Sequence, residues 1–217
     1  MIPLALVIFA FFALAPAAAA ADVPPLQQVV SRLETVYRET ADFSAHFSQE
    51  TLLPGGTAAE KSSGTVAIKK PSKMRWNFSA PISQEIVLDG THVWIYQPDQ
   101  KQVVKRRQAD AFPPGSATNF LAGIGRLRED FDPAFALENR VNQHGNILLR
   151  LIPKQKDLTL TRVMLEVDPK SWAVIRVSLH DSARGTTTIR FSRIAMNKGI
   201  PDETFRFVPP KGVTVVE

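Results

Sequence analysis

Most of the chain shows a two-residue hydrophobic period, the pattern of a β-strand that buries one face and exposes the other. In Lys73–Ser79 the even-numbered residues are large and apolar and the odd-numbered residues are polar, and a similar alternation begins at Phe43. Such segments recur as far as Phe205–Phe207, separated by turn signals such as Asp89-Gly90, which suits a type I′ hairpin turn. The spacing predicts a mainly β protein built as an antiparallel meander of about a dozen strands.

Two segments follow a helical period instead. Apolar residues in 26–37 recur three and four positions apart after Pro24-Pro25, and Glu34 belongs to the opposite, polar side. This pattern predicts an amphipathic helix. A second, short helix is expected within 113–125, where apolar residues at helical spacing lie in a stretch rich in glycine and alanine.

Residues 1–21 form an uncharged leader that ends in small residues. A short apolar core followed by alanines is typical of a secretory signal peptide, and its A-x-A patterns place cleavage after Ala19, Ala20 or Ala21. The alternative is a retained N-terminal anchor, for which the apolar core is short. We expect residues 22–217 to form a single exported domain, since β-barrels and sandwiches of about 200 residues fold as one unit.

The sequence lacks the residue patterns of an enzyme active site. Its four histidines are scattered without metal-ligand spacing, and it contains no phosphate-binding loop or nucleophile motif. The 217 residues include no cysteine, which excludes disulfides, thiol chemistry and a lipid-modified cysteine. The net charge of +5 suits either an acidic partner or ordinary solubility. We expect no catalytic residue, no metal, no cofactor and no nucleic-acid partner.

One face of the predicted sheet carries many large apolar side chains, with at most two helices to cover them. They permit two interpretations: a fully packed barrel core, which is the norm, or a cavity for an apolar ligand. The cavity interpretation predicts a set of ligand-contacting residues on the strands and on both helices. These are Phe43, Phe47, Ile68, Met74, Trp76, Phe78, Trp94 and Tyr96, with Leu26, Val30, Leu33, Leu121 and Ile124.

A resemblance to a known family favours the cavity. The residues that carry it span nearly the whole chain after the leader and occur in the family's order. They are Phe43, Phe47 and Gln49; Ser63-Gly64; Ile68–Pro71; Arg75-Trp76; Pro81, Gln84, Ile86-Val87 and Asp89-Gly90; Val93–Tyr96; Gln102-Val103; Ile200-Pro201; and Phe205–Val213. In this joint pattern the chain resembles the LolA family, the periplasmic carriers of outer-membrane lipoproteins in Gram-negative bacteria.

The resemblance implies an incomplete antiparallel β-barrel of about 11–12 strands, with helices as a lid over a hydrophobic cavity. It implies a monomer in the periplasm that receives lipoproteins from an inner-membrane ABC-type release complex and delivers them to an outer-membrane LolB-like acceptor. LolB shares the fold but is itself a lipoprotein, so the absence of cysteine favours the soluble carrier. A general lipid or glycolipid carrier of the same fold would have the same apolar lining.

Lys70 departs from the family pattern. Well-known members have an arginine before this proline, and that arginine hydrogen-bonds the lid backbone and keeps the lid closed. A lysine retains the charge but loses the planar five-donor fork. We expect Lys70 to act as the lid latch, with Lys69 or Arg75 as alternative cations; the other interpretation is an ordinary charge at a strand end.

Overall fold

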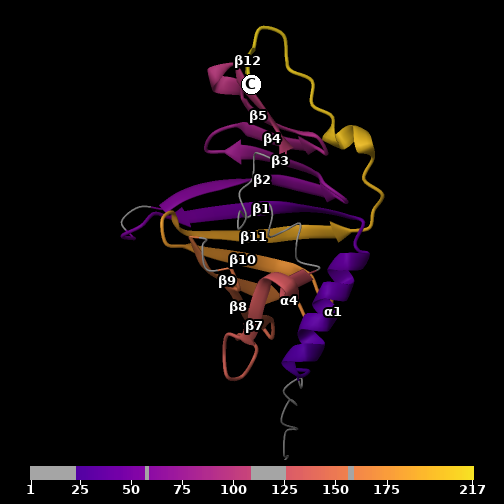
Figure 1. Cartoon of the computed structure of the whole chain (residues 1–217), viewed down its shortest axis with the longest axis vertical. Helices are drawn as coiled ribbons and strands as arrows, with labels where there is room; N and C mark the ends of the chain where they lie inside the picture. Colours follow the sequence, from indigo (N-terminus) through magenta and orange to yellow (C-terminus); the bar gives the residue numbers. More distant parts are fainter. Residues whose placement is uncertain (1–22, 57–58, 109–125, 156–158) are drawn as a thin grey trace, which may run out of the picture.

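The computed structural model describes residues 23–56, 59–108, 126–155 and 159–217 (Figure 1). Within these ranges twelve strands form one sheet in the order β12-β6-β5-β4-β3-β2-β1-β11-β10-β9-β8-β7. Neighbouring strands are antiparallel except β12 and β6, which run parallel. The sheet stays open, because in the described part of the chain β7 and β12 form its two edges. The prediction of a mainly β, incomplete antiparallel barrel with a helical lid is confirmed.

The described elements follow the predicted order of one helix and then strands, but the strands form two meanders, β1–β6 and β7–β11, that are joined by the pairing of β1 with β11. The strands are β1 Asp42–Leu52, β2 Ala59–Lys69, β3 Lys73–Ala80, β4 Gln84–Asp89, β5 His92–Gln97, β6 Gln102–Arg107, β7 Phe131–Phe135, β8 Ile147–Pro153, β9 Leu160–Val167, β10 Val174–Asp181, β11 Gly185–Met196 and β12 Thr214–Val216. The helices are α1 Leu26–Glu39 and α4 Leu127–Asp130, with the 3₁₀ helices η1 Pro98–Gln100 and η3 Asp202–Phe205. The predicted signal peptide and the predicted helix at Leu121 and Ile124 lie outside the described residues.

β1 lies at the centre of the sheet. It pairs with β2 on one side and with β11 on the other, so the runs β1–β6 and β7–β11 form two halves that meet there (Figure 1). At Gly64 in β2 the backbones approach closely, since a Cβ atom on that residue would lie 1.8 Å from the carbonyl oxygen of Asn77. A glycine is therefore required at this point of the pairing between β2 and β3.

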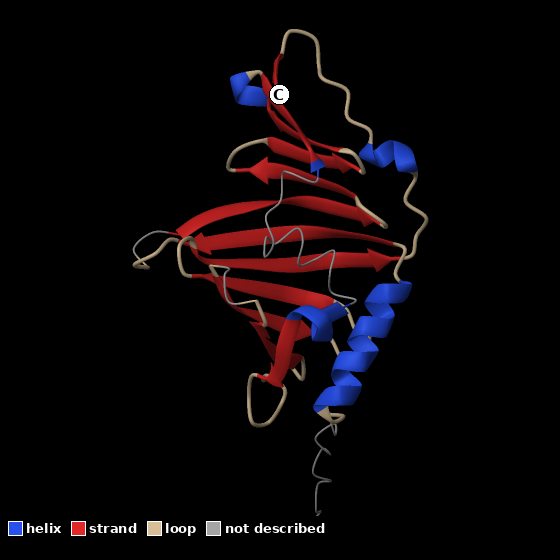
Figure 2. Cartoon of the chain, in the orientation of Figure 1, coloured by secondary structure: helices blue, strands red, loops and turns tan. Residues whose placement is uncertain are grey.

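The two faces of the sheet differ in what covers them. We call the face against which α1 packs the inner face, and α1 lies alongside the β7–β10 half of the sheet (Figure 2). The buried apolar side chains of the inner face form one cluster with Val29, Val30 and Leu33 of α1. This stripe is the apolar side that the helical period predicted, and its burial accounts for a helix whose N-terminus has no side-chain cap.

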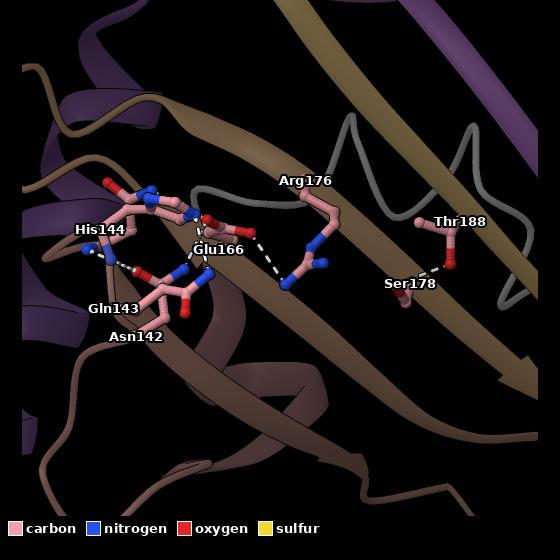
Figure 3. A network of polar contacts seen from close by, with 8 residues as sticks. Asn142, Gln143, His144, Glu166, Arg176, Ser178 and Thr188 are labelled. Carbon is pink, nitrogen blue, oxygen red and sulfur yellow. Dashed lines mark hydrogen bonds and ion pairs between the residues drawn. The ribbon is translucent and has the colours of Figure 1, made fainter.

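The outer face carries a polar network over β9 and β10. Glu166 of β9 is buried there, and its carboxylate accepts hydrogen bonds from the side-chain amides of Asn142 and Asn146 at 2.7 and 2.8 Å (Figure 3). Arg176 of β10 completes the network at 2.8 Å from the same carboxylate. A buried carboxylate is stable when it is paired and hydrogen-bonded in this way.

Over β3–β5 the outer face is covered by residues 200–208, which we call the C-terminal segment. Phe205 is fully buried within it, and η3 packs on β3 and β4. Lys69 donates to the carbonyl oxygen of Ile200 at 2.7 Å, and Arg75 donates to that of Thr204 at 2.8 Å. These contacts attach the segment across the ends of β2 and β3.

Two local predictions are wrong. Phe205–Phe207 is not a strand, because Phe205 ends η3 and the chain then runs extended over the outer face without pairing in the sheet. The loop after Asp89 is not a type I′ turn, which needs a positive φ at both central residues. Only Gly90 has one, at 103°, and the Asp89 carboxylate instead accepts hydrogen bonds from the backbone of Thr91 and His92.

Candidate functional site

Aromatic residues of β1 and β3 form the centre of the inner face. The rings of Phe47 and Trp76 meet edge to face with centroids 4.7 Å apart, and Phe78 lies 5.0 Å from Phe47. The indole N–H of Trp76 points at the sulfur of Met74, 2.9 Å away. Phe43 joins the same face through an edge contact with Phe191 of β11. The alternation in β3 therefore predicted correctly which of its side chains share a face.

The apolar inner face continues beyond the predicted residues. The register places Trp76 opposite Ile86 of β4, Ile86 opposite Ile95 of β5, and Ile95 opposite Val104 of β6. These three aliphatic side chains, like the predicted residue Ile68, are half-buried, whereas Trp76 is buried. Ile86 and Ile95 were missed because β4 and β5 are apolar on both faces, so that the period-two signal of these strands is weak.

Trp94 and Tyr96 were predicted on this face, and that placement is wrong. Both lie on the outer face, one residue out of step with Ile95, where Phe207 of the C-terminal segment packs at centroid distances of 5.5 and 5.9 Å. The indole N–H of Trp94 also donates to the Asp89 carboxylate at 2.8 Å. Burial alone would raise the pKa of Asp89, but this bond and those from the turn backbone hold it far below its usual range.

The predicted apolar residues of α1 lie against the inner face. Val30 and Leu33 are fully buried in the same cluster as Trp76, and Leu26 is partly buried at its margin. Tyr37 extends the apolar stripe of α1, and its hydroxyl oxygen accepts a hydrogen bond from the backbone N–H of Val174 at 2.8 Å. Burial raises the pKa of Tyr37 to about 12, against the lowering effect of that hydrogen bond.

Lys70, in the turn between β2 and β3, contacts the C-terminal end of α1. Its ammonium group donates to the carbonyl oxygens of Tyr37 and of Arg38, the latter at 3.0 Å. These are carbonyls of the last turn, which lack partners inside the helix and carry the negative end of its dipole. Burial, and secondarily the charge of Arg38, lower the pKa of Lys70. The structure thus places Lys70 where it contacts the backbone of the helical lid.

Glu34 also connects α1 to its surroundings, although its position in the helix predicted a polar, exposed side. Its carboxylate is buried and accepts three hydrogen bonds from Arg128 of α4. Sequence reasoning had no signal for this pair, because its two residues are 94 positions apart.

A separate cleft of about 420 Å³ lies on the outer side of β11, β1, β2 and the end of β3. Eight of its ten lining residues have hydroxyl, amide or charged side chains, in contrast to the large apolar side chains of the inner face. The lining residues are Ser48, Gln49, Glu50, Lys61, Ser62, Ser63, Ala80, Pro81, Thr188 and Arg190.

The described residues contain neither a metal-binding cluster nor a membrane-spanning helix. No three His, Asp or Glu side chains within those ranges gather closely enough to hold a metal ion. None of the helices described there has the length and apolar character needed to cross a membrane. The predicted contacts Leu121 and Ile124 fall outside these ranges, so the structure gives them no place.

Known proteins match most of this chain. Residues 38–208 match the family model described as outer membrane lipoprotein carrier protein LolA. The outer-membrane lipoprotein carrier protein of Dechloromonas aromatica is 33% identical, over 86% of this chain and 86% of its own length. That of Bordetella pertussis is 33% identical, over 98% of this chain and 95% of its own length.

The fold also matches a solved structure. An uncharacterized conserved protein from Thermus thermophilus superposes with a TM-score of 0.54 and 14% identity, over 88% of this chain and 97% of that chain. At that identity the likeness concerns the fold alone. The family match and the curated relatives, which extend over most of the sequence, establish that the chain belongs to the LolA family of outer-membrane lipoprotein carrier proteins.

Proposed function

We propose that this protein carries outer-membrane lipoproteins by binding their acyl chains on the inner face of the sheet. The observation that supports this most directly is a continuous apolar face running from Phe43 through Trp76 to Val104, with the helix α1 packed on the same face. An enzyme would need a cluster of reactive groups, whereas a carrier needs only apolar surface that can be uncovered and covered again.

The energetics of an acyl chain set the requirements for such a carrier. Burying a methylene group gains about 0.8 kcal/mol, so a chain of about 15 methylenes gains roughly 12 kcal/mol. A carrier must cover most of that surface in water and still release it. The half-buried side chains Ile68, Ile86 and Ile95 offer apolar surface that a ligand can complete, while α1 supplies surface that competes with the ligand.

The proposed route follows from the family. The protein would work in the periplasm after export by its signal peptide. There it would receive acylated lipoproteins from an inner-membrane ABC-type release complex and transfer them to an outer-membrane LolB-like acceptor. The names of the curated relatives support the cargo and the compartment.

A pair of matched substitutions tests the inner face. Ile95→Glu places a carboxylate on the half-buried inner face, and Ile152→Glu places one on the outer face of β8, where the wild-type side chain is 40% exposed. The probe is a fluorescent triacylated lipopeptide, with binding followed by fluorescence anisotropy and folding by circular dichroism and urea titration.

We expect Ile95→Glu to weaken lipopeptide binding by about tenfold or more, since a carboxylate must lose water where the acyl chain binds. Ile152→Glu should bind like the wild type. Equal binding by both variants, with both folded, would refute the inner face as the acyl site. Binding of free fatty acids and glycolipids as tight as that of lipopeptide would favour a general lipid carrier instead.

A further inference from the structure

An acidic side chain occupies a buried position of α1 beside Leu33. Only 5% of the surface of Glu34 is exposed, although α1 otherwise buries apolar residues there. A carboxylate at such a position costs free energy unless it is paired and hydrogen-bonded. Its presence therefore calls for an explanation beyond packing.

One residue satisfies both carboxylate oxygens. The backbone N–H of Arg128 donates to Oε1 of Glu34 at 2.8 Å, and its guanidinium donates to Oε2 through Nε at 2.8 Å and Nη2 at 2.6 Å. A planar fork and a backbone donor acting together fix both the distance and the orientation of the carboxylate. The pair thus defines where α1 sits and how it is rotated.

Arg128 itself belongs to a part of the structure that is attached to the sheet. Leu127, its neighbour in α4, is fully buried in the core cluster. The carbonyl oxygen of Arg128 accepts a hydrogen bond from the side chain of Lys154 at 2.6 Å. The backbone N–H of Lys154 donates to the backbone carbonyl oxygen of Asp130 at 2.9 Å. Because Lys154 directly follows β8, α4 is anchored to the end of that strand.

We propose that Arg128 is the positioning residue for the lid: its pair with Glu34 fixes α1 in the closed position, and acyl uptake separates the two. This inference rests on the proposed function, because it assigns the pair a role in uncovering the inner face. Lys70 contacts the last turn of α1, whereas Arg128 contacts Glu34 nearer its middle, so the two residues hold α1 at different points along its length.

The chemistry of the pair suits a contact that must open. The Arg128 side chain is already 55% exposed while the Glu34 side chain is 6% exposed. When α1 lifts, Glu34 leaves with it and becomes hydrated, so separation does not leave a buried, unpaired charge on the sheet. An apolar side chain at the same place would instead be exposed to water when α1 lifts, at the full hydrophobic cost of that exposure.

The test uses the full-length mature protein without ligand. Arg128→Gln removes the charge and the fork. Glu34→Gln removes the charge and replaces one of the two acceptor oxygens by an amide donor. Arg128→Lys keeps the charge with fewer donors. Arg176→Gln is the matched control, because it breaks another pair with a buried carboxylate, that of Glu166 on the outer face. Hydrogen–deuterium exchange of the α1 amides is compared with that of β9, and global stability is measured by urea titration.

We expect the α1 amides to exchange about tenfold faster or more in Arg128→Gln, with smaller increases in Glu34→Gln and Arg128→Lys, after correction for global stability. Arg176→Gln should leave α1 exchange unchanged. Equal acceleration of α1 and β9 in Arg128→Gln, or the same α1 acceleration in the control, would overturn the inference. If Arg128→Gln does not fold, Glu34→Gln decides by the same criterion.

A second measurement links the pair to uptake. The association rate of the triacylated lipopeptide should rise by a factor similar to that of α1 exchange in Arg128→Gln. If α1 exchange rises while the association rate does not, the pair positions α1 without gating uptake, and the proposal is wrong in that part. If the wild type binds no lipopeptide at all, the proposed function fails, whereas the exchange data still report on the anchor.

Discussion

Replacing Lys70 by leucine should loosen the C-terminal end of α1 by a predictable amount. The substitution removes two hydrogen bonds from a charged donor to the carbonyls of Tyr37 and Arg38. Each such bond contributes about 0.5–1.5 kcal/mol net, and the cation adds about 0.3–1 kcal/mol through the helix dipole. Discounting for solvent exposure leaves about 1–2 kcal/mol, which corresponds to a roughly 5- to 30-fold larger population of detached α1.

Amide hydrogen exchange measures this population directly. The last two turns of α1 should exchange about 5- to 30-fold faster in Lys70→Leu, while the strands should be unaffected. Lys70→Arg should exchange no faster than the wild type, since a guanidinium can reach both carbonyls. Lys61→Leu is the control, because Lys61 is an exposed lysine whose ion-pair partner, Glu50, lies on the outer face at 3.7 Å.

The same variant separates a latch from an ordinary surface charge. Closure of α1 over the inner face provides free energy that expels the acyl chain, so Lys70→Leu should transfer bound lipopeptide to acceptor vesicles more slowly than the wild type. Exchange of α1 within twofold of the wild type, together with an unchanged transfer rate, would refute the reasoning and leave Lys70 as a plain strand-end cation.

Two further predictions concern stability. Burial alone would raise the pKa of Asp42, but backbone N–H groups of residues 198–200 lower it, so its stabilisation is present above pH ~4 and is lost on further acidification. Asp42→Asn should lower the free energy of unfolding by about 1.5–3 kcal/mol at pH 7. Urea titration should also show that the variant loses less stability than the wild type between pH 5 and 2. An unchanged pH profile would contradict this. Gly64→Ala should cost about 3 kcal/mol or more, because its Cβ would overlap the carbonyl of Asn77, and an unchanged urea midpoint would disprove that overlap.

The parts of the fold that were predictable are those in which only one face of an element is covered. In β3 the outer residues are polar and the inner ones apolar, so the alternation identified Met74, Trp76 and Phe78 as sharing a face. The stripe of α1 followed for the same reason. The strand order was not predicted, since sequence periodicity gives elements and not their partners. The pairing of β1 with β11 has no signal in the local sequence.

The errors have physical causes that local sequence does not contain. The C-terminal segment covers the outer face of β4 and β5, which makes these strands apolar on both sides and removes the alternation that would have separated Trp94 from Ile95. Glu34 looked like a surface residue because its partner, Arg128, is distant in sequence. In both cases tertiary contacts decided which side of an element is buried.

The consecutive lysines at the end of β2 have a mechanical consequence. Lys69 binds the C-terminal segment on one side of the sheet, through Ile200 and Asp202, while Lys70 binds α1. Two coverings on opposite sides are thus tied to one short turn. A displacement of this turn would therefore move the anchor points of both coverings together, although the two lie on opposite faces of the sheet.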